Sequence, residues 1–346
     1  MNSKQNYLKQ AQNIKLKGKY DYNVSSNFDE RYREVFPQLS PKQFVVLANR
    51  YPNYANCKTA EKIKQKFGLK NIILGAGSED LIIKCNKIIR SKGWKTGVIL
   101  PTFYRITETL KEWQPITKDK FLGNELNDMD IIWVCNPNPL DGQIIEKNIL
   151  LNIFKKNKKI IFLIDETTIF FLDNWQGFSF LGQTPKNVLV INSFSKLFGL
   201  SGLRAGFASG NLNLLHLLQQ EGTTFPFTSI TESFVESILK NDRFFENIRI
   251  EIKKNKNEVE QILKQNTAIE IKPSETNCIF CRYKKNQSLY RDLLKKGIIS
   301  LNLDQQFGIP RQGWVRLTAH SSKKLHKILI AKIKFLNREG KNETKN

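Results

Sequence analysis

The sequence lacks a long apolar run. No stretch of its 346 residues approaches the roughly eighteen uncharged apolar residues that a transmembrane helix requires. The segment from Met1 to Lys19 is polar and has no apolar core of the kind that marks a secretory signal peptide. We therefore expect a cytoplasmic protein that has no membrane partner.

Histidine and cysteine are scarce, which limits metal and disulfide chemistry. The chain contains 3 His and 5 Cys, and an odd cysteine number in a large chain argues against a disulfide framework. Cys278 and Cys281 form a C-x-x-C, but Asn277–Tyr283 has the pattern of a strand, in which positions three apart point to opposite faces. Because no second ligand pair accompanies them, we expect neither a metal site nor a redox pair.

Acidic residues are in deficit. The chain has 55 Lys and Arg against 32 Asp and Glu, a net charge of +23, which can attract nucleic acid or an anionic membrane. The cations are nevertheless spread from end to end. The densest run, Lys323 to Lys334, alternates with Leu and Ile at the spacing of a solvated amphipathic helix. We therefore favour a lysine-rich surface without a nucleic-acid partner, one that can concentrate phosphorylated substrates.

Strand-like and helix-like patterns alternate through the middle of the chain. Helix-like stretches such as Ser78–Arg90 and Lys147–Asn157 separate most of the apolar runs. Strands that alternate with helices indicate an α/β sheet, mostly parallel, with helices on both faces. The strand-like runs are Asn71–Leu74, Thr96–Leu100, Asp130–Cys135, Lys159–Ile164, Asn187–Ile191 and Leu203–Ala208.

The C-terminal third has a different pattern. A long charged helical segment, Asn241–Gln265, precedes strand-like pieces at Ala268–Ile271, Cys278–Tyr283 and Trp314–Leu317, and a terminal helix begins at about Ser322. A chain of this length usually divides its core between two domains. We predict a large α/β domain at residues 42–235. The remaining residues, 1–41 and 236–346, are expected to form a small α+β domain.

Lys196 lies in the most informative segment. It follows an apolar run in Ile191-Asn-Ser-Phe-Ser-Lys, and glycines punctuate the residues after it. A lysine that forms a Schiff base must lose its proton, which favours a site short of solvent and near other positive charge. Ser193, Ser195 and Arg204 could together bind a dianionic phosphate. The alternative is a surface lysine in a glycine-rich loop, and this segment alone leaves both open.

Asp165 ends the buried run Ile161-Phe-Leu-Ile-Asp. Ligands in α/β folds bind at the carboxyl ends of the strands. An acid at that place can keep the pyridine nitrogen of a cofactor such as pyridoxal 5′-phosphate protonated, so that the ring acts as an electron sink. An isolated Asp there is more commonly a helix N-cap or a solvated strand end.

Two further segments follow strand-like runs. Asn138, in Cys135-Asn-Pro-Asn-Pro-Leu-Asp-Gly, is held extended by the proline after it. Its side chain can donate to an oxygen on the ring of such a cofactor. Gly75-Ala-Gly-Ser-Glu79 lies between a strand and a helix, where backbone N–H groups bind phosphate. Either segment alone is also compatible with a plain turn.

Together these segments resemble the class I/II aminotransferases, which are pyridoxal 5′-phosphate (PLP) enzymes of fold type I. The similarity is to the branch that includes histidinol-phosphate aminotransferases and threonine-phosphate decarboxylases. The segment Ser193–Arg204 is similar to the lysine motif of the family, with the same interval of eight from Lys196 to Arg204. Asn138 precedes Asp165 by 27 residues, as in that branch. The matching elements span residues 22–317 in family order.

The resemblance implies a role for each matching residue and a homodimer with shared active sites. Lys196 would hold the cofactor and carry the proton, and Asp165 would keep the ring nitrogen protonated. Phe103 in Pro101-Thr-Phe would stack on the ring, to which Asn138 would donate. Arg316 would bind the substrate carboxylate, and Asn27 belongs to a segment, Tyr22–Asn27, that closes over substrate. The phosphate would be bound by Gly77, Ser78, Glu79, Ser193, Ser195, Arg204 and the partner's Tyr51.

Two positions depart from the family pattern. The family usually has Asn-Asn-Pro-Thr-Gly where this chain has Asn138-Pro-Leu-Asp-Gly142, and a register fixed on Gly142 would place Pro139 at the Asn position. The interval of 27 residues favours Asn138. Thr168 stands three residues after Asp165, where the family usually has a Tyr that also bonds to the cofactor ring and that contributes to tuning it. The shorter side chain weakens assignment to a plain histidinol-phosphate enzyme.

We predict a PLP-dependent aminotransferase that moves an amino group between an amino acid, or a phosphorylated amine, and a 2-oxo acid. One alternative is a PLP-dependent threonine-phosphate decarboxylase on the same scaffold. Another is a catalytically silent PLP-fold protein with a binding or regulatory role, against which the set of Lys196, Asp165 and Arg316 argues. The sequence does not name the substrate, because an arginine at position 316 fits many acids.

Overall fold

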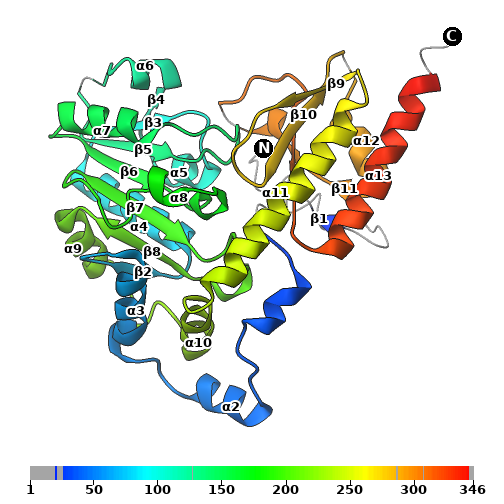
Figure 1. Ribbon diagram of the computed structural model, residues 1–346. Helices are drawn as coiled ribbons and strands as arrows, with labels where there is room; N and C mark the ends of the chain where they lie inside the picture. Colours follow the sequence, from blue (N-terminus) through cyan, green and yellow to red (C-terminus); the bar gives the residue numbers. More distant parts are fainter. Residues whose placement is uncertain (1–19, 22–25, 127, 286, 307, 343–346) are drawn as a thin grey trace.

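The computed structural model describes residues 20–21, 26–126, 128–285, 287–306 and 308–342, which are arranged around two main sheets (Figure 1). We refer to the part around the seven-stranded sheet as the large domain and to the part around the four-stranded sheet as the small domain. Within these residues no helix is both long and apolar enough to cross a membrane. The long helix α11 (Asp242–Lys264) runs from the large domain onto the small one.

A seven-stranded sheet in the order β2-β8-β7-β6-β5-β3-β4 is the centre of the large domain. The pairs from β4 through β7 are parallel, whereas β8 pairs antiparallel with both β7 and β2. The predicted mostly parallel sheet is therefore confirmed, and the edge strand β4 is an addition to it. The strands are β2 (Ile73–Gly75), β3 (Thr96–Ile99), β4 (Gln114–Ile116), β5 (Ile131–Cys135), β6 (Ile161–Asp165), β7 (Val188–Ser193) and β8 (Gly206–Gly210).

Helices cover both faces of this sheet because its strands are apolar on both sides. On β7, Leu189 and Ile191 pack with α4 (Ser78–Lys92), α5 (Tyr104–Thr109) and α9 (Leu212–Gln220). Val188 and Val190 point to the other face. That face is covered by α3 (Cys57–Phe67), α7 (Lys147–Lys156), α10 (Ser229–Ile238) and the start of α11.

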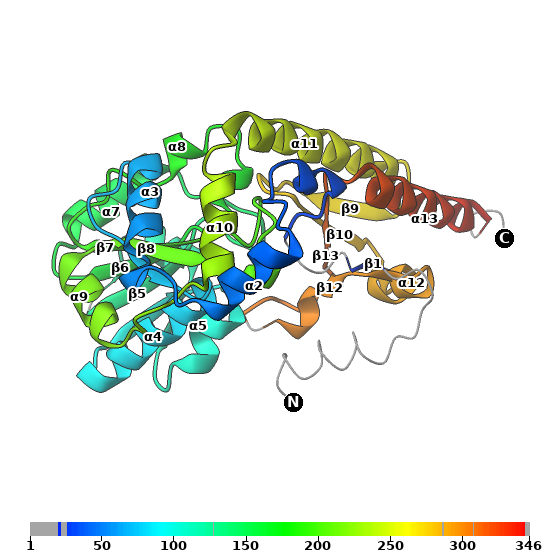
Figure 2. The same ribbon diagram turned by 90° about the horizontal axis from the view of Figure 1, so that it is seen from below.

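The small domain has a four-stranded antiparallel sheet in the order β12-β13-β10-β9. One face packs on α11 and α13 (Lys323–Asn342), which lie side by side in both views (Figures 1 and 2). A separate pair joins β1 (Tyr20–Asp21) to β11 (Ile298–Ile299) in parallel. The remaining elements are β9 (Ile269–Lys272), β10 (Cys278–Tyr283), α12 (Leu289–Lys295), β12 (Leu301–Asn302) and β13 (Val315–Thr318).

The two faces of the small sheet have different partners. Ile279 and Cys281 of β10 join the core under the helices, whereas Cys278 and Phe280 cluster with Leu140 of the large domain. The strand predicted for the C-x-x-C segment is thus confirmed, and its two thiols point to opposite faces. The second face carries Arg316 toward the large domain, because Arg316 pairs in register with Phe280.

Helix α2 (Pro41–Asn49) projects from the large domain at the bottom of Figure 1. It is a well-formed helix, with Pro41 in its first turn and a capping box between Ser40 and Gln43, yet it has no buried residue. Phe44 is 51% exposed and Val45 is 53% exposed. The remaining short elements are η1 (Glu30–Glu34), η2 (Tyr54–Asn56), α6 (Lys118–Leu122), η3 (Ile169–Phe171), α8 (Trp175–Phe178), η4 (Ser201–Leu203) and η5 (Leu303–Gln305).

Candidate active site

The site forms where β5, β6 and β7 end. Cys135 of β5 is in register with Asp165 of β6, which is in register with Ile191 of β7. Because these neighbouring strands are parallel, the segments that follow them meet at one edge of the sheet. Asn138, Asp165 and Lys196 are therefore placed at the same edge, as expected for a ligand site of an α/β fold.

Asp165 is a buried acid at the last position of β6, with 4% of its surface exposed. Its Oδ1 accepts a hydrogen bond from the backbone N–H of Thr167 at 2.9 Å. Burial raises the pKa of the Asp165 carboxyl, while its hydrogen bonds to Thr167 and the charge of Lys196 act in the opposite direction. Such a carboxylate is ready to pair with a cationic group of a ligand.

The pKa of the Lys196 amine is lowered to about 8, chiefly by burial and then by the charge of Arg316. Asp165 opposes this shift, and Arg204 adds to it. A lysine with such a pKa is partly neutral near physiological pH and can attack a carbonyl group. These electrostatic neighbours also show that Arg316 and Arg204 lie near Lys196.

An anion cradle lies between the start of α4 and the segment before β8. Gly77 precedes α4 with φ +85°, and a Cβ added to it would lie 2.5 Å from Nη2 of Arg204. Gly206 is equally close to the helix, because its Cβ would lie 2.6 Å from the backbone nitrogen of Ser78. The N–H groups of a helix start beside a guanidinium are the donors that a phosphate requires.

The two serines before Lys196 complete this cradle. Ser193 donates from its hydroxyl to the carbonyl of Ala205 at 3.3 Å and accepts from the backbone N–H of Ser195 at 3.1 Å. Arg204 Nη1 donates to the Ser201 carbonyl at 3.0 Å and to Ser195 Oγ at 3.5 Å. The tight turn around Lys196 is therefore held by the same residues that face the cradle.

The side chain of Glu79 is paired within the chain, although the sequence predicted that it binds the phosphate. Its carboxylate forms an ion pair with Nε of Arg105 at 2.6 Å, and Arg105 also pairs with Glu108. The Glu79 side chain is committed to α5. Its backbone N–H, in the first turn of α4, is the group that it can present to an anion.

Asn138 and Thr168 are buried beside the Asp165 strand end. Asn138 donates from Nδ2 to the carbonyl of Pro101 at 2.6 Å, and its Oδ1 accepts from the N–H of Leu140 at 2.9 Å. Within the described part of the chain, the second amide hydrogen of Asn138 has no acceptor and can serve a ligand. Thr168 donates to the Pro137 carbonyl at 3.3 Å. The bond to Pro101 also fixes the turn that carries Phe103, whose ring packs edge-on against Tyr104 at 4.9 Å.

Arg316 reaches from the small sheet to the large domain. It is 7% exposed, and its Nη1 donates to the carbonyl of Pro139 at 2.8 Å, next to Asn138. The guanidinium therefore lies between the two domains, near Lys196, where it can meet an acidic group of a substrate.

Asn27 is not oriented toward an open site. Its Nδ2 donates to Tyr32 Oη at 2.8 Å and to Ser321 Oγ at 2.7 Å, and its Oδ1 accepts from the N–H of Ser321 at 2.9 Å. Both amide hydrogens are used within the chain, which argues against the expected substrate contact. The preceding residues of the expected closing segment, Tyr22 to Ser25, lie outside the described residues.

Tyr51 lies on the surface, 85% exposed, with its ring 5.2 Å from that of Phe225. The chain's own site therefore brings together the residues around Lys196 without Tyr51.

The sequence did not point to three contacts of this site: Arg105 with Glu79, Cys278 near Lys196, and Tyr32 with Leu197. None of the three had a local signal, because the i,i+3 spacing of Arg105 and Glu108 predicts only the pair that these two residues form.

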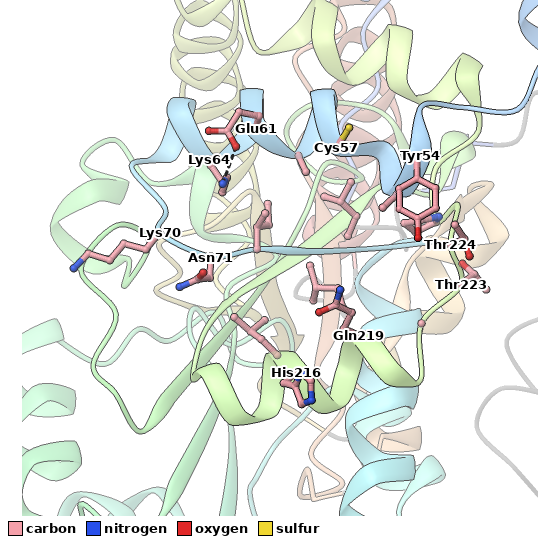
Figure 3. Close-up of a pocket in the computed structure, with 18 of the residues that line it drawn as sticks. Tyr54, Cys57, Glu61, Lys64, Lys70, Asn71, His216, Gln219, Thr223 and Thr224 are labelled. Atoms are coloured by element: carbon pink, nitrogen blue, oxygen red, sulfur yellow. Dashed lines mark ion pairs between the residues drawn. The ribbon is translucent and has the colours of Figure 1, made fainter.

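A cavity of about 610 Å³ lies elsewhere, between α3, the edge strand β2 and α9 (Figure 3). None of the residues assigned above lines it. Figure 3 shows Glu61 and Lys64 paired with one another, at 2.7 Å. Tyr54 and His216 also line it. We place the chemistry at Lys196, because the buried acid, the amine of lowered pKa and the anion cradle converge there.

Comparisons with known proteins agree with this geometry. The family model described as aminotransferase class I and II matches residues 48–333. A histidinol-phosphate aminotransferase of Blochmanniella floridana is 26% identical over 317 residues, 86% of each chain.

Two solved structures show the same fold. L-threonine-O-3-phosphate decarboxylase from Porphyromonas gingivalis has a TM-score of 0.78 at 17% identity, covering 91% of this chain and 98% of that one. Histidinol-phosphate aminotransferase from Sinorhizobium meliloti, in complex with pyridoxal-5′-phosphate, has a TM-score of 0.78 at 15% identity, covering 96% and 94%.

Proposed function

Because this chain belongs to the aminotransferase class I and II family, it is a PLP-dependent transferase, and we propose that its substrates are an amino acid, or a phosphorylated amine, and a 2-oxo acid. One observation carries this proposal. A buried acid, an amine of lowered pKa and a helix-start anion cradle with an arginine lie at one sheet edge, around Asp165, Lys196 and Arg204.

The residues fit PLP group by group. The cradle of Ser78, Ser195 and Arg204 suits its dianionic phosphate, Asp165 suits its ring nitrogen, and the remaining amide hydrogen of Asn138 suits its ring oxygen. When bound, PLP supplies an electron sink that stabilises negative charge on the α-carbon of the substrate. Lys196 Nζ would hold the cofactor and would then take the proton from that carbon.

Arg316 orients the substrate for this proton transfer. Its buried guanidinium can bind a carboxylate bidentately between the domains. A carboxylate held in one orientation by Arg316 would leave the α-hydrogen of the substrate facing Lys196, and this hydrogen would then be lost. We propose this arrangement, and therefore transamination, with the basic surface favouring acidic or phosphorylated substrates.

Decarboxylation of phosphothreonine is the second candidate. The observation that favours it is Thr168, whose hydroxyl donates to the Pro137 carbonyl and lies where most aminotransferases of this branch have a tyrosine. In that case Arg316 would hold the carboxylate in the orientation from which carbon dioxide leaves instead of the proton.

Borohydride reduction and single-turnover spectra test these proposals. Reduction of the holoenzyme should fix the cofactor to Lys196, as found by peptide mapping, and Lys196→Ala should abolish turnover while retaining some bound cofactor. An amino donor without an acceptor should convert the cofactor to its amine form and release one oxo acid. A label at another residue refutes the site, and carbon dioxide released from phosphothreonine refutes transamination.

We propose a homodimer in which Tyr51 reaches the phosphate cradle of the partner subunit. Support comes from the exposed apolar side of α2 and from the neighbouring Tyr54, which is 77% exposed. Mixing Tyr51→Phe with Lys196→Ala chains should give dimers with one intact site, and so an activity above that of either variant. Subunit exchange that restores nothing would exclude this role of Tyr51.

A further inference from the structure

A segment near the N-terminus of the chain holds the backbone that directly follows the Lys196 side chain. The N–H of Asn27 donates to the carbonyl of Lys196 at 3.1 Å. The hydroxyl of Tyr32 donates to the carbonyl of the next residue, Leu197. These two consecutive carbonyls belong to the turn that directs the amine, and their partners are 165 or more residues away in the sequence.

The two donors are themselves fixed. Asn27 donates from its side chain to the Tyr32 oxygen at 2.8 Å, so that the pair forms a single hydrogen-bonded unit. Asn27 is 2% exposed and Tyr32 6%. The Tyr32 ring packs against Gly199, where an added Cβ would lie 2.3 Å from Cε2 of that ring. Burial raises the pKa of the Tyr32 hydroxyl, which stays protonated and a donor.

The same unit is tied to the small domain. Asn27 exchanges two hydrogen bonds with Ser321, one from Nδ2 to Oγ at 2.7 Å and one from the Ser321 N–H to Oδ1 at 2.9 Å. Ser321 also donates to Asp29, which pairs with Arg31 at 2.6 Å. Ser321 follows Arg316 by five residues, just beyond the end of β13.

We propose that Asn27 and Tyr32 are positioning residues, which fix the Lys196 turn and, through Ser321, set its place relative to the strand that carries Arg316. The inference rests on the proposed role of Lys196 as the amine that holds PLP. Both residues bond to backbone carbonyls of the Lys196 turn. Each residue acts on the Lys196 amine through the backbone that it holds. This matters because proton transfer requires the amine to be held within a fraction of an ångström of its productive position.

Tyr32→Phe is the sharpest test, because the ring and its packing against Phe36 and Phe244 remain while one hydroxyl is lost. We expect kcat of the holoenzyme to fall about 10- to 100-fold with an unchanged KM for the amino donor. Tyr283→Phe is the matched control. It removes a tyrosine hydroxyl that donates to Asp292 in the small domain, and it should leave kcat at the wild-type value.

A second measurement uses the apo-protein. Competitive acetylation across a pH series, followed by mass spectrometry of the Lys196 peptide, reports the pKa of its amine. In Tyr32→Phe this pKa should rise from about 8 toward that of a solvated lysine, because the loosened turn hydrates the charged form. Ser321→Ala removes the hydroxyl bonds of Ser321 with Asn27 and Asp29 and keeps its backbone bond to Asn27, and it should raise KM more than it lowers kcat.

The outcomes separate the two proposals. A Tyr32→Phe enzyme whose kcat and Lys196 pKa equal those of wild type and Tyr283→Phe would overturn the inference while leaving the proposed function intact. Wild-type protein that carries no borohydride label at Lys196 would overturn the proposed function, and the inference with it. A fall in kcat that Tyr283→Phe reproduces would also overturn it, since loss of any tyrosine hydroxyl would then suffice.

Discussion

Replacement of Gly77 by alanine probes the anion cradle directly. An added Cβ would lie 2.5 Å from Nη2 of Arg204, and the Gly77 backbone has φ +85° and ψ 165°, a region that is essentially restricted to glycine. The guanidinium must therefore move away. Its hydrogen bond to a charged phosphate, worth about 1.5–3 kcal/mol, is then lost. Since each 1.4 kcal/mol is tenfold in Kd, PLP affinity should fall about 10- to 100-fold.

The assay is a PLP titration of the Lys196→Ala protein, in which covalent attachment does not mask the phosphate contacts. Gly202→Ala, two residues before Arg204, is the control, because an added Cβ there meets no atom within 4 Å. Gly93→Ala controls for backbone strain, since Gly93 has φ +63° and equally open surroundings. Equal Kd values for Lys196→Ala with and without Gly77→Ala would refute the cradle as described.

Three further predictions concern Lys196, a pair of threonines and Asp165. The free energy of unfolding of the apo-protein should increase as the pH rises from about 8 to 10.5, because in this range Lys196 is protonated only in the unfolded state. In Lys196→Met this increase should vanish. At pH 7 the variant should be more stable than wild type by up to about 3 kcal/mol in urea unfolding. Thr318 Oγ1 is buried without a partner among the described residues, so Thr318→Val should stabilise by about 1 kcal/mol. Thr96→Val loses a hydrogen bond to the Trp94 carbonyl and should destabilise the protein by a similar amount. If thermal unfolding showed both threonine variants to be stabilised, or both destabilised, the argument would be contradicted. Asp165→Asn should lower kcat roughly 10²- to 10³-fold in steady-state assays without unfolding the protein, and wild-type rates would exclude its role at the ring nitrogen.

The main strands and the core of the site were predictable from local patterns. β5, β6 and β7 are continuous apolar runs that end in polar residues or are followed at once by one, so their order along the chain already places Asp165 and Lys196 near one edge. The helices α4 and α7 begin at the predicted residues, Ser78 and Lys147. By contrast, β4 has three residues, one of them Pro115, with two exposed positions, and such a short edge strand has no recognisable pattern.

Side-chain partners were not predictable in the same way. Glu79 and Asn27 were expected to face ligands, but the first pairs with Arg105 and the second with Ser321, 294 residues away. A motif specifies a backbone position, whereas the partner of a polar side chain depends on which distant residue the fold brings close. The antiparallel direction of β8 could have been predicted. A parallel connection needs a long crossover, and residues 194–205 contain no helix longer than η4.

The close approach of Gly206 to the start of α4 has a consequence for how the protein matures. Gly77 and Gly206 meet only because the edge strand β2 pairs with β8, with Gly75 opposite Gly206 in register. Contacts between such distant parts of a chain form late, because a large loop must close first. The phosphate cradle therefore does not exist until the sheet is complete, and PLP is a ligand of the finished domain. PLP should therefore raise the stability of the folded protein by mass action, increasingly as the ligand concentration rises relative to its Kd, and should not be needed to start folding.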